Sequence, residues 1–404
     1  MEYLAKRYDT GQPVRITLRG KKVQAIRPAP SGDDLPIVGP GFFDIQINGA
    51  LGYDFSSDKI TVEQIAAVFR QVIGTGVFRF CPTMITNSPE AYRHGITALM
   101  ETLETYPEFQ PAMAGIHLEG PFIANETGPR GSHPPKFCVP YNLELIEELQ
   151  RISGGRIRIV TLSPTYSGAA EFIGQLTALG ILVATGHTNA SPSQISEAAA
   201  AGARLATHLG NASHHDFPKW GNYFFSQLTD DRLYASMIAD GFHLSPMMMR
   251  TILRTKGLGR MILISDQADV AGCPPGKYKS GPSALEVLEN GKIALASNNY
   301  LLAGASYSVS RGLCNVMAAG NLSLAEAYPL CTTHPAALLG EPAFSNGDEH
   351  DFLAVGKQAD FLIFRHEPSR LGPMGISDSD NLRVGRFHFE AIVRAGKEEP
   401  IFKP

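Results

Sequence analysis

The segment Ala114-Gly115-Ile116-His117-Leu118-Glu119-Gly120-Pro121 decides the fold, because a short apolar run stops at a carboxylate and is then closed by Gly-Pro. A buried parallel strand has this form when its last residue lies at the carboxyl edge of its sheet. Three later runs end in the same way, in His187, His208 and Asp266. We therefore expect these four polar side chains to meet at one edge of a parallel sheet.

Strand-like and helix-like segments alternate through most of the chain, an order that favours a parallel sheet with helices outside it. The expected strands cover residues 41–48, 76–83, 114–119, 157–162, 181–187, 203–208, 234–240 and 260–266. The expected helices cover residues 62–73, 91–103, 143–150, 169–179, 193–201 and 246–256. These segments make about eight strand–helix repeats, so the predicted fold class is α/β, with a (β/α)8 TIM barrel.

The two chain ends differ from the middle of the chain in their residue pattern. Residues 14–19 and 23–26, and later 359–364 and 390–397, read as short β-strands. We expect the two ends to pair into one small β-sandwich. The predicted domains are residues 1–39 for the first part of the sandwich, 40–340 for a metal-dependent barrel and 341–404 for the second part. Residues 371–386 are rich in Gly, Ser, Asp and Pro and are predicted to form a surface loop.

The composition of the 404 residues disfavours several classes of protein. Hydrophobic residues make up 44% and charged residues 18%, which supplies a large core. The formal net charge of -4 gives no reason to expect nucleic acid or an anionic membrane as a partner. No apolar run is long enough to span a bilayer, and residues 1–8 lack the apolar stretch of a signal peptide. The 5 cysteines are scattered without a CxxC pair, which disfavours a thiolate zinc site or disulfide framework and suits the cytoplasm.

Glu119, His187 and His208 form a candidate metal site. A glutamate and two histidines are a common ligand set for a catalytic zinc, and they leave a coordination position open for water. Asp266 could then handle the proton of that water as a general base. Taken singly, each residue has a plainer interpretation: a surface carboxylate, a hydrogen-bonded structural histidine or a helix N-cap. Their shared place at one sheet edge favours one divalent metal ion per subunit, with zinc as the expected metal.

Gln46 and Asn48 end the first expected strand, where a site for two metals would need histidines. Amides are poor zinc ligands compared with imidazole, so we expect one metal, with Gln46 and Asn48 lining the pocket. A polar strand end without a role is the alternative. His243 closes another strand and is a candidate substrate contact, or else a capping or core histidine. The segment His214-His215-Asp216 is interpreted as a rim or substrate loop rather than as metal ligands, because adjacent histidines point in different directions in most conformations.

Together these segments resemble those of the N-acetylglucosamine-6-phosphate deacetylases, a family of the amidohydrolase superfamily. The resemblance covers nearly the whole chain and is carried by residues 40–44, 117–122, 186–188, 207–212, 240–243, 265–266, 302–304 and 333–336. It implies a metal-bearing (β/α)8 barrel with a β-sandwich built from both chain ends. It also implies that the metal ligands are Glu119, His187 and His208, and that Asp266 accepts and donates the proton. The residues implied to contact the sugar are Ser132, His133, Asn211, Ala212, His243, Leu302, Ala303 and Gly304.

One loop departs from the family pattern. The family carries an arginine in a GRxPG-like loop, where it meets the substrate phosphate, whereas this chain reads Ser213-His214-His215-Asp216-Phe217-Pro218-Lys219-Trp220-Gly221. Lys219 falls near the arginine position and is the predicted replacement. Because a lysine is a point charge and lacks the bidentate geometry of arginine, a different or an unphosphorylated amino sugar stays open as the substrate.

The resemblance implies a metal-dependent amidohydrolase that converts N-acetylglucosamine-6-phosphate and water into glucosamine-6-phosphate and acetate. Alternatives are another amidohydrolase reaction, such as hydrolysis of an N-acyl amino acid or a cyclic amide, and a non-catalytic scaffold that kept the barrel. The expected partner is a small-molecule amino sugar, with neither nucleic acid nor membrane. A homodimer is also implied, because loops meet at the active site in dimers of the family.

Overall fold

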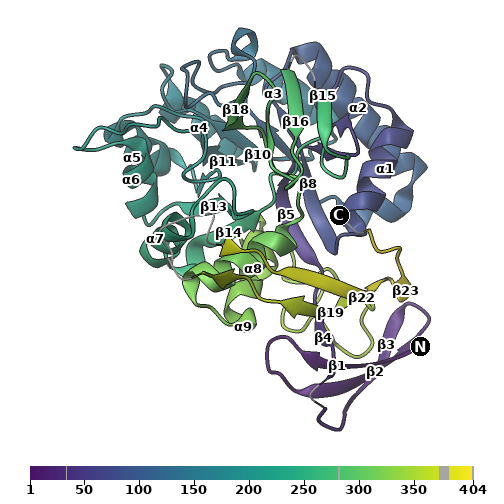
Figure 1. Ribbon diagram of the computed structural model, residues 1–404. Coiled ribbons are helices and arrows are strands. Elements are labelled where there is room, and N and C mark those ends of the chain that lie inside the picture. Colours follow the sequence, from purple (N-terminus) through teal and green to yellow (C-terminus); the bar gives the residue numbers. More distant parts are fainter. Residues whose placement is uncertain (33, 281–282, 373–381, 403–404) are drawn as a thin grey trace.

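The computed structural model describes residues 1–32, 34–280, 283–372 and 382–402. A parallel barrel occupies its centre, with helices outside (Figure 1). The barrel strands are β5 (Phe42–Ile47), β8 (Val77–Ile85), β9 (Ile116–Glu119), β10 (Ile157–Leu162), β11 (Leu182–Thr185), β12 (Leu205–Ala206), β13 (Tyr234–Ile238) and β14 (Met261–Ile264). The first and last strands close the ring, because the Asp266 N–H donates to the Gln46 carbonyl at 3.1 Å. The predicted (β/α)8 barrel is confirmed.

Helices flank the barrel strands on the outside. They are α1 (Val62–Ile73), α2 (Pro89–Thr105), α3 (Leu143–Ile152), α4 (Ala169–Ala178), α5 (Pro192–Ala201), α6 (Tyr223–Thr229), α7 (Pro246–Lys256), α8 (Val309–Gly320), α9 (Leu324–Ala327) and α10 (Thr333–Leu339), with the short 3-10 helices η1 (Pro107–Ala112), η2 (Pro135–Phe137), η3 (Leu258–Arg260) and η4 (Tyr328–Cys331). Capping boxes begin α1 and α5, where Thr61 and Ser191 exchange hydrogen bonds with Gln64 and Gln194. The predicted helices correspond to α1 to α5 and α7.

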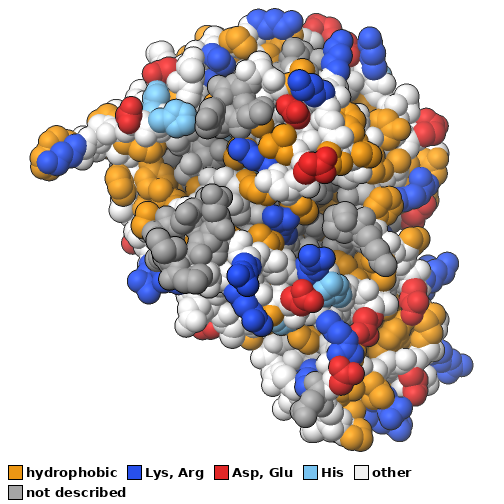
Figure 2. Space-filling view, in the orientation of Figure 1, with side chains coloured by type: hydrophobic (Ala, Val, Ile, Leu, Met, Phe, Trp, Pro, Cys, Tyr) orange, Lys and Arg blue, Asp and Glu red, His pale blue; other side chains and the backbone are white. Residues whose placement is uncertain are grey.

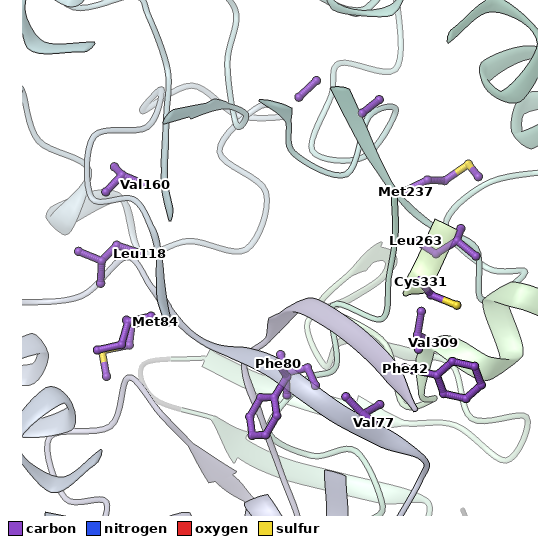
Figure 3. Close-up of a cluster of buried hydrophobic side chains, with 14 of the residues drawn as sticks. Phe42, Val77, Phe80, Met84, Leu118, Val160, Met237, Leu263, Val309 and Cys331 are labelled. Carbon is purple, nitrogen blue, oxygen red and sulfur yellow. The ribbon is translucent and has the colours of Figure 1, made fainter. Parts of the chain in front are cut away.

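Two hydrophobic layers support the barrel. The outer layer lies between the strands and the helices, and Figure 3 shows part of it, with Phe80 on β8, Leu118 on β9 and Met237 on β13. The inner layer includes Phe43, Ile45, Cys81, Ile159, Ala184, Leu205, Ile238, Ile262 and Ile264. On β9 the strand alternation turns Leu118 toward the helices and Glu119 toward the interior. The apolar filling precedes the polar strand ends, so polar chemistry is confined to the carboxyl end of the barrel.

Strands from both chain ends form one seven-stranded sheet, seen at the bottom of Figure 1. In spatial order they are β23 (Lys397–Glu398), β22 (Arg386–Arg394), β19 (Phe361–Glu367), β4 (Ile37–Gly39), β1 (Glu2–Arg7), β2 (Pro13–Arg19) and β3 (Lys22–Pro28). β4 pairs with β1 on one side and with β19 on the other, so the two ends of the chain meet there. The prediction that both ends build one β module is confirmed. The boundaries after residues 39 and 340 stay predictions; β4 ends at Gly39 and α10 ends at Leu339.

A small antiparallel sheet that was not predicted from the sequence follows β14. It consists of β15 (Gly276–Ser280), β16 (Ser283–Val287), β17 (Ile293–Leu295) and β18 (Asn298–Leu302). Its strands are short, and the residues of β15 are at most half-buried. The sequence of β15 therefore shows little of the apolar pattern that predicts a strand. Residues 373–381 of the predicted loop 371–386 lie outside the described residues, and the flanks pair as β20 (Arg370–Leu371) and β21 (Leu382–Arg383).

The surface carries charge of both signs. Figure 2 shows basic and acidic side chains interspersed over this face of the molecule. None of the helices in the described ranges combines the length and the apolar character needed to cross a bilayer.

Tyr328, in η4, joins the barrel to the seven-stranded sheet. Its ring is fully buried and stacks on Phe364 of β19 with 6.0 Å between ring centroids. Its hydroxyl donates to the Pro40 carbonyl, 2.9 Å away, at the entrance to the first barrel strand. A buried carbonyl that loses its donor destabilises a fold, so this single hydroxyl supports the junction.

We expect Tyr328→Phe to lower the free energy of unfolding by about 1–3 kcal/mol, because the buried Pro40 carbonyl is left without a partner. Urea titration followed by circular dichroism measures the change. Tyr278→Phe is the matched control, since it removes an exposed hydroxyl bonded to the Pro274 carbonyl at 2.7 Å. Equal destabilisation by the two variants would contradict the role of burial.

Candidate active site

The polar strand ends meet in one cavity at the carboxyl end of the barrel. Glu119 is the last residue of β9, whereas His187, His208 and Asp266 each lie two positions beyond their strands. All four are buried and line the cavity. They come from four different strands, and the barrel brings them together at one edge, as predicted from the sequence.

Three of these residues have an unusual backbone. The φ angle is +47° at His187, +32° at His208 and +51° at Asp266, in the left-handed region that non-glycine residues rarely adopt. Strict alternation along β11 would turn residue 187 to the side of Thr185, whose hydroxyl donates to Gln227 of α6 at 2.8 Å. The left-handed residue breaks this alternation and turns the His187 ring into the cavity. Such strain persists only where the surrounding structure fixes it.

The side chains of Glu119, His187 and His208 converge on one point. Glu119 Oε1 lies 2.8 Å from His208 Nε2 and 3.2 Å from His187 Nε2, and the two Nε2 atoms are 3.1 Å apart. Ligand atoms around a tetrahedral zinc stand about 3.3 Å apart, so this spacing fits a metal site. His187 Nδ1 lies 3.0 Å from the Pro129 carbonyl, so Nδ1–H donates a hydrogen bond to that carbonyl. The lone pair of Nε2 is then available for a metal. The cluster could therefore bind a metal.

His133 offers a second set of ligand atoms with Glu119 and His187, all within 4.8 Å of one another. Its own hydrogen bonds favour a different role. Burial lowers the pKa of His133 to about 3, so the ring is neutral. The Thr86 N–H points at His133 Nδ1 from 3.4 Å, which makes Nδ1 the acceptor and places the ring proton on Nε2. A protonated Nε2 donates hydrogen bonds, so the geometry favours His208 as the third ligand and His133 as a donor in the cavity.

Two amide side chains connect Asp266 to the cluster of Glu119, His187 and His208. Asn48 Nδ2 donates to Asp266 Oδ1 at 2.8 Å. Gln46 Nε2 donates to the same oxygen at 3.1 Å and to Glu119 Oε1 at 2.9 Å. Burial, and then the negative charge of Glu119, raise the pKa of Asp266 to about 6. A carboxylate with this pKa is suited to accept and return a proton near neutral pH.

Charge balance in the cluster depends on the histidines. Burial by itself would raise the pKa of Glu119, but hydrogen bonds from His187 and His208 outweigh it and hold the pKa well below its usual range. Burial likewise opposes charge on His208, yet the hydrogen bond to Glu119 raises its pKa. Positive charge is therefore favoured at this point, as it would be for a bound cation.

The remaining predicted residues fall into two groups. Those that line the same cavity are Asn48, Ser132, His133, Asn211, Ala212, Leu302, Ala303 and Gly304. Gln46 lies behind Glu119 and Asp266, and the His243 side chain is only 1% exposed, with Nδ1 2.9 Å from Asp240 Oδ2. Lys219 lies apart from the cavity on an exposed loop.

The loop between β12 and α6 forms an arm that projects from the barrel beside α5 and α6 (Figure 1). Lys219 and Trp220 are exposed on it, with the ammonium 5.1 Å from the indole ring. His214, nearer the barrel, hydrogen-bonds Glu126 at 3.0 Å and the Tyr223 hydroxyl at 2.9 Å. Within one subunit, the structure does not bring Lys219 to the site.

Several lining residues were not predicted. They include Asp54, Asp269, Ser280 and Leu285. Burial, and then the charge of Asp269, raise the pKa of Asp54 to about 7. Asp54 lies in the hairpin of β6 (Gly49–Ala50) and β7 (Tyr53–Asp54), which gives no strand-end signal in the sequence. No lysine or arginine is among the described residues that line the cavity.

A (β/α)8 barrel with a glutamate, two histidines and an aspartate at its carboxyl end defines a class of metal-dependent hydrolases. Residues 37–384 match the model of the amidohydrolase family. The chain is 33% identical over 339 residues to N-acetylglucosamine-6-phosphate deacetylase of Danio rerio, covering 81% of this chain and 80% of that protein. It is 35% identical over 340 residues to the enzyme of that name from Caenorhabditis elegans, covering 81% and 78%.

The crystal structure of N-acetyl-D-glucosamine-6-phosphate deacetylase from Mycobacterium smegmatis has a TM-score of 0.80 to this chain, with 26% identity, covering 98% of this chain and 99% of that one. The chain thus belongs to the amidohydrolase family, among the N-acetylglucosamine-6-phosphate deacetylases, and it is a hydrolase.

We expect His208→Ala to lose the metal that the purified protein carries, because it removes one of the three converging ligands. His133→Ala is the control and should keep it, since its Nε2 carries a proton. Elemental analysis by mass spectrometry after dialysis measures the metal per chain. Loss of metal from His133→Ala together with retention in His208→Ala would show the opposite ligand set.

Proposed function

We propose that the protein hydrolyses the N-acetyl amide of N-acetylglucosamine-6-phosphate, releasing acetate and glucosamine-6-phosphate. The observation that carries this proposal is the bridge between Glu119 and Asp266, in which one Gln46 amide holds the general base beside the metal cluster. The names of the similar proteins support the same substrate. The partner is accordingly a small-molecule amino sugar.

We infer one zinc ion per subunit, held by Glu119, His187 and His208. When bound there, such an ion would lower the pKa of a water molecule and would polarise the amide carbonyl. Gln46 supports one metal rather than two. Its amide N–H groups already lie between Glu119 and Asp266, and a donor group there repels a second cation.

The protein's own groups move the proton. Asp266 accepts a proton from the water that attacks the amide carbon, and Asn48 and Gln46 hold the carboxylate in place. The His133 Nε2–H donates to the carbonyl oxygen as negative charge develops there. Asp266 then returns the proton to the nitrogen of the scissile bond. The nitrogen can therefore leave as a neutral amine, which is a far better leaving group than the amine anion. The new C–O bond comes from water, the C–N bond breaks, and acetate and the free amine leave.

An unphosphorylated or different amino sugar is the second candidate, and one observation favours it. The described cavity lining contains Asp54 and Asp269 and no cationic Lys or Arg, whereas a phosphate needs positive charge. Under the main proposal, that charge comes from Lys219 of a second copy in a homodimer. Exposed Phe217 and Trp220, the latter 85% exposed, give the arm an apolar surface for such contact.

We propose the cytoplasm as the location. All 5 cysteines are free thiols in the structure, which suits a reducing compartment.

Asp266→Asn should lower kcat roughly 10²- to 10⁴-fold, because the amide cannot accept and return the proton. Metal content and the urea midpoint should stay close to wild type. Asp231→Asn, at an exposed carboxylate paired with Arg260, is the control and should leave kcat unchanged. Substantial turnover by Asp266→Asn would contradict the assigned role.

Acetate release from N-acetylglucosamine-6-phosphate and from N-acetylglucosamine, measured side by side on metal-loaded protein, tests the substrate. We expect kcat/KM to favour the phosphorylated sugar, and Lys219→Ala to raise KM for that sugar alone. Activity on the unphosphorylated sugar only would reassign the substrate and leave the chemistry in place. Acetate from neither sugar, with metal bound, would favour another amidohydrolase reaction, and absence of metal would favour a scaffold.

A further inference from the structure

His117 is a buried histidine inside the barrel, directly below the candidate metal cluster. It is 1% exposed and precedes Glu119 by two positions on β9. Its Nδ1 lies 3.1 Å from the Ile45 carbonyl on β5, and its Nε2 lies 2.7 Å from Thr161 Oγ1 on β10. A carbonyl can only accept, so Nδ1 donates to Ile45. In the neutral ring Nε2 then accepts the Thr161 hydroxyl proton.

The hydrogen bonds continue across the barrel to β12. Thr161 Oγ1 lies 2.8 Å from Thr207 Oγ1, and both side chains are buried. Since the single Thr161 proton goes to His117, Thr207 is the donor in this pair. The chain therefore runs from Thr207 through Thr161 and His117 to the Ile45 carbonyl, and it links the residue that directly follows β12 with β10, β9 and β5.

Gly186 makes room for this chain. It follows β11, the strand between β10 and β12, and a Cβ atom there would lie 2.8 Å from Thr161 Cγ2 and 2.9 Å from Thr207 Cβ. The two threonine hydroxyls can meet only because residue 186 has no side chain. The glycine is thus required because the side chains of Thr161 and Thr207 approach each other across the end of the intervening strand, β11.

Three residues that belong to the chain or make room for it each directly precede a residue of the site. Ile45 precedes Gln46, Gly186 precedes His187, and Thr207 precedes His208. His187 and His208 hold left-handed φ angles, which need support from the structure around them. We propose that His117 is a positioning residue, which with Thr161, Thr207 and Gly186 fixes the strand ends that carry the metal ligands. The inference rests on the ligand set of the proposed function and does not depend on the substrate.

Thr161→Val tests this directly, because it keeps the shape of the side chain and removes the central hydroxyl of the chain. The readouts are the affinity for Co2+, measured by competition with a chelator, and the visible absorption bands of bound Co2+, which report ligand geometry. We expect affinity to fall about 10- to 100-fold, as for other groups that orient metal ligands, and the bands to shift. Thr161→Ser restores the hydroxyl and should bring both readouts back toward wild type.

Thr185→Val is the matched control. Thr185 is an equally buried threonine on the neighbouring strand, but its hydroxyl donates outward to Gln227 of α6 at 2.8 Å. The Thr185→Val variant should lower the free energy of unfolding in urea as Thr161→Val does, while leaving the absorption bands of bound Co2+ unchanged. A shift of equal size in both variants would mean that any buried threonine matters equally, and would overturn the inference.

Gly186→Ala provides a second route that deletes no hydrogen-bonding group. Its Cβ forces Thr161 and Thr207 apart, so it should weaken Co2+ binding in the same direction. If wild-type protein binds Co2+ and both Gly186→Ala and Thr161→Val bind it equally well, the inference is overturned while the proposed ligand set stands. Failure of wild-type protein to bind Co2+ overturns the ligand set and the inference together.

Discussion

Two carboxylates, Glu119 and Asp266, are buried in one cavity, and the rest of the site depends on keeping both there. Burying a charge costs free energy unless partners replace the lost water, and two like charges raise that cost. Gln46 donates to both carboxylates, Asn48 adds a bond to Asp266, and the two histidine rings face Glu119. Under the proposed ligand set, a cation among Glu119, His187 and His208 would complete the compensation, which would link metal binding to the folding of this end of the barrel.

The barrel makes this arrangement possible because its apolar interior lies at a different depth from the polar residues of the site. Apolar residues such as Ile159, Ala184 and Leu205 fill the interior below, while the chain of hydrogen bonds through His117 lies between that filling and the site. The side chains of His117, Thr161 and Thr207 are thus hydrogen-bonded to one another or to the backbone at the depth where water is excluded. The cavity above them can carry strained backbone because the layers beneath it are rigid.

The sequence was informative where a residue's role follows from its place on a strand. Apolar runs that stop at Glu119, His187 and His208 predicted the edge of the sheet and the convergence of these residues, because the barrel repeats one local pattern. Orientation was not predictable, since the left-handed angles at His187 and His208 carry no glycine signal. Asp54, Asp269 and the sheet of β15 to β18 were missed because tertiary packing, not periodicity, brings them to the cavity. Lys219 was predicted to contact substrate because it falls near the arginine position of the family motif. Within one subunit, its exposed loop leads away from the cavity.

The seven-stranded sheet has a consequence for synthesis on the ribosome. β4 emerges early with β1 to β3, but its second partner, β19, is made only after the whole barrel has been translated. Until then the outer side of β4 is an open strand edge, the kind of surface that recruits strands from other chains. At three residues, Ile37–Gly39, β4 offers such a partner very few hydrogen bonds. The shortness of this strand therefore protects the nascent chain during the interval in which its sheet is incomplete.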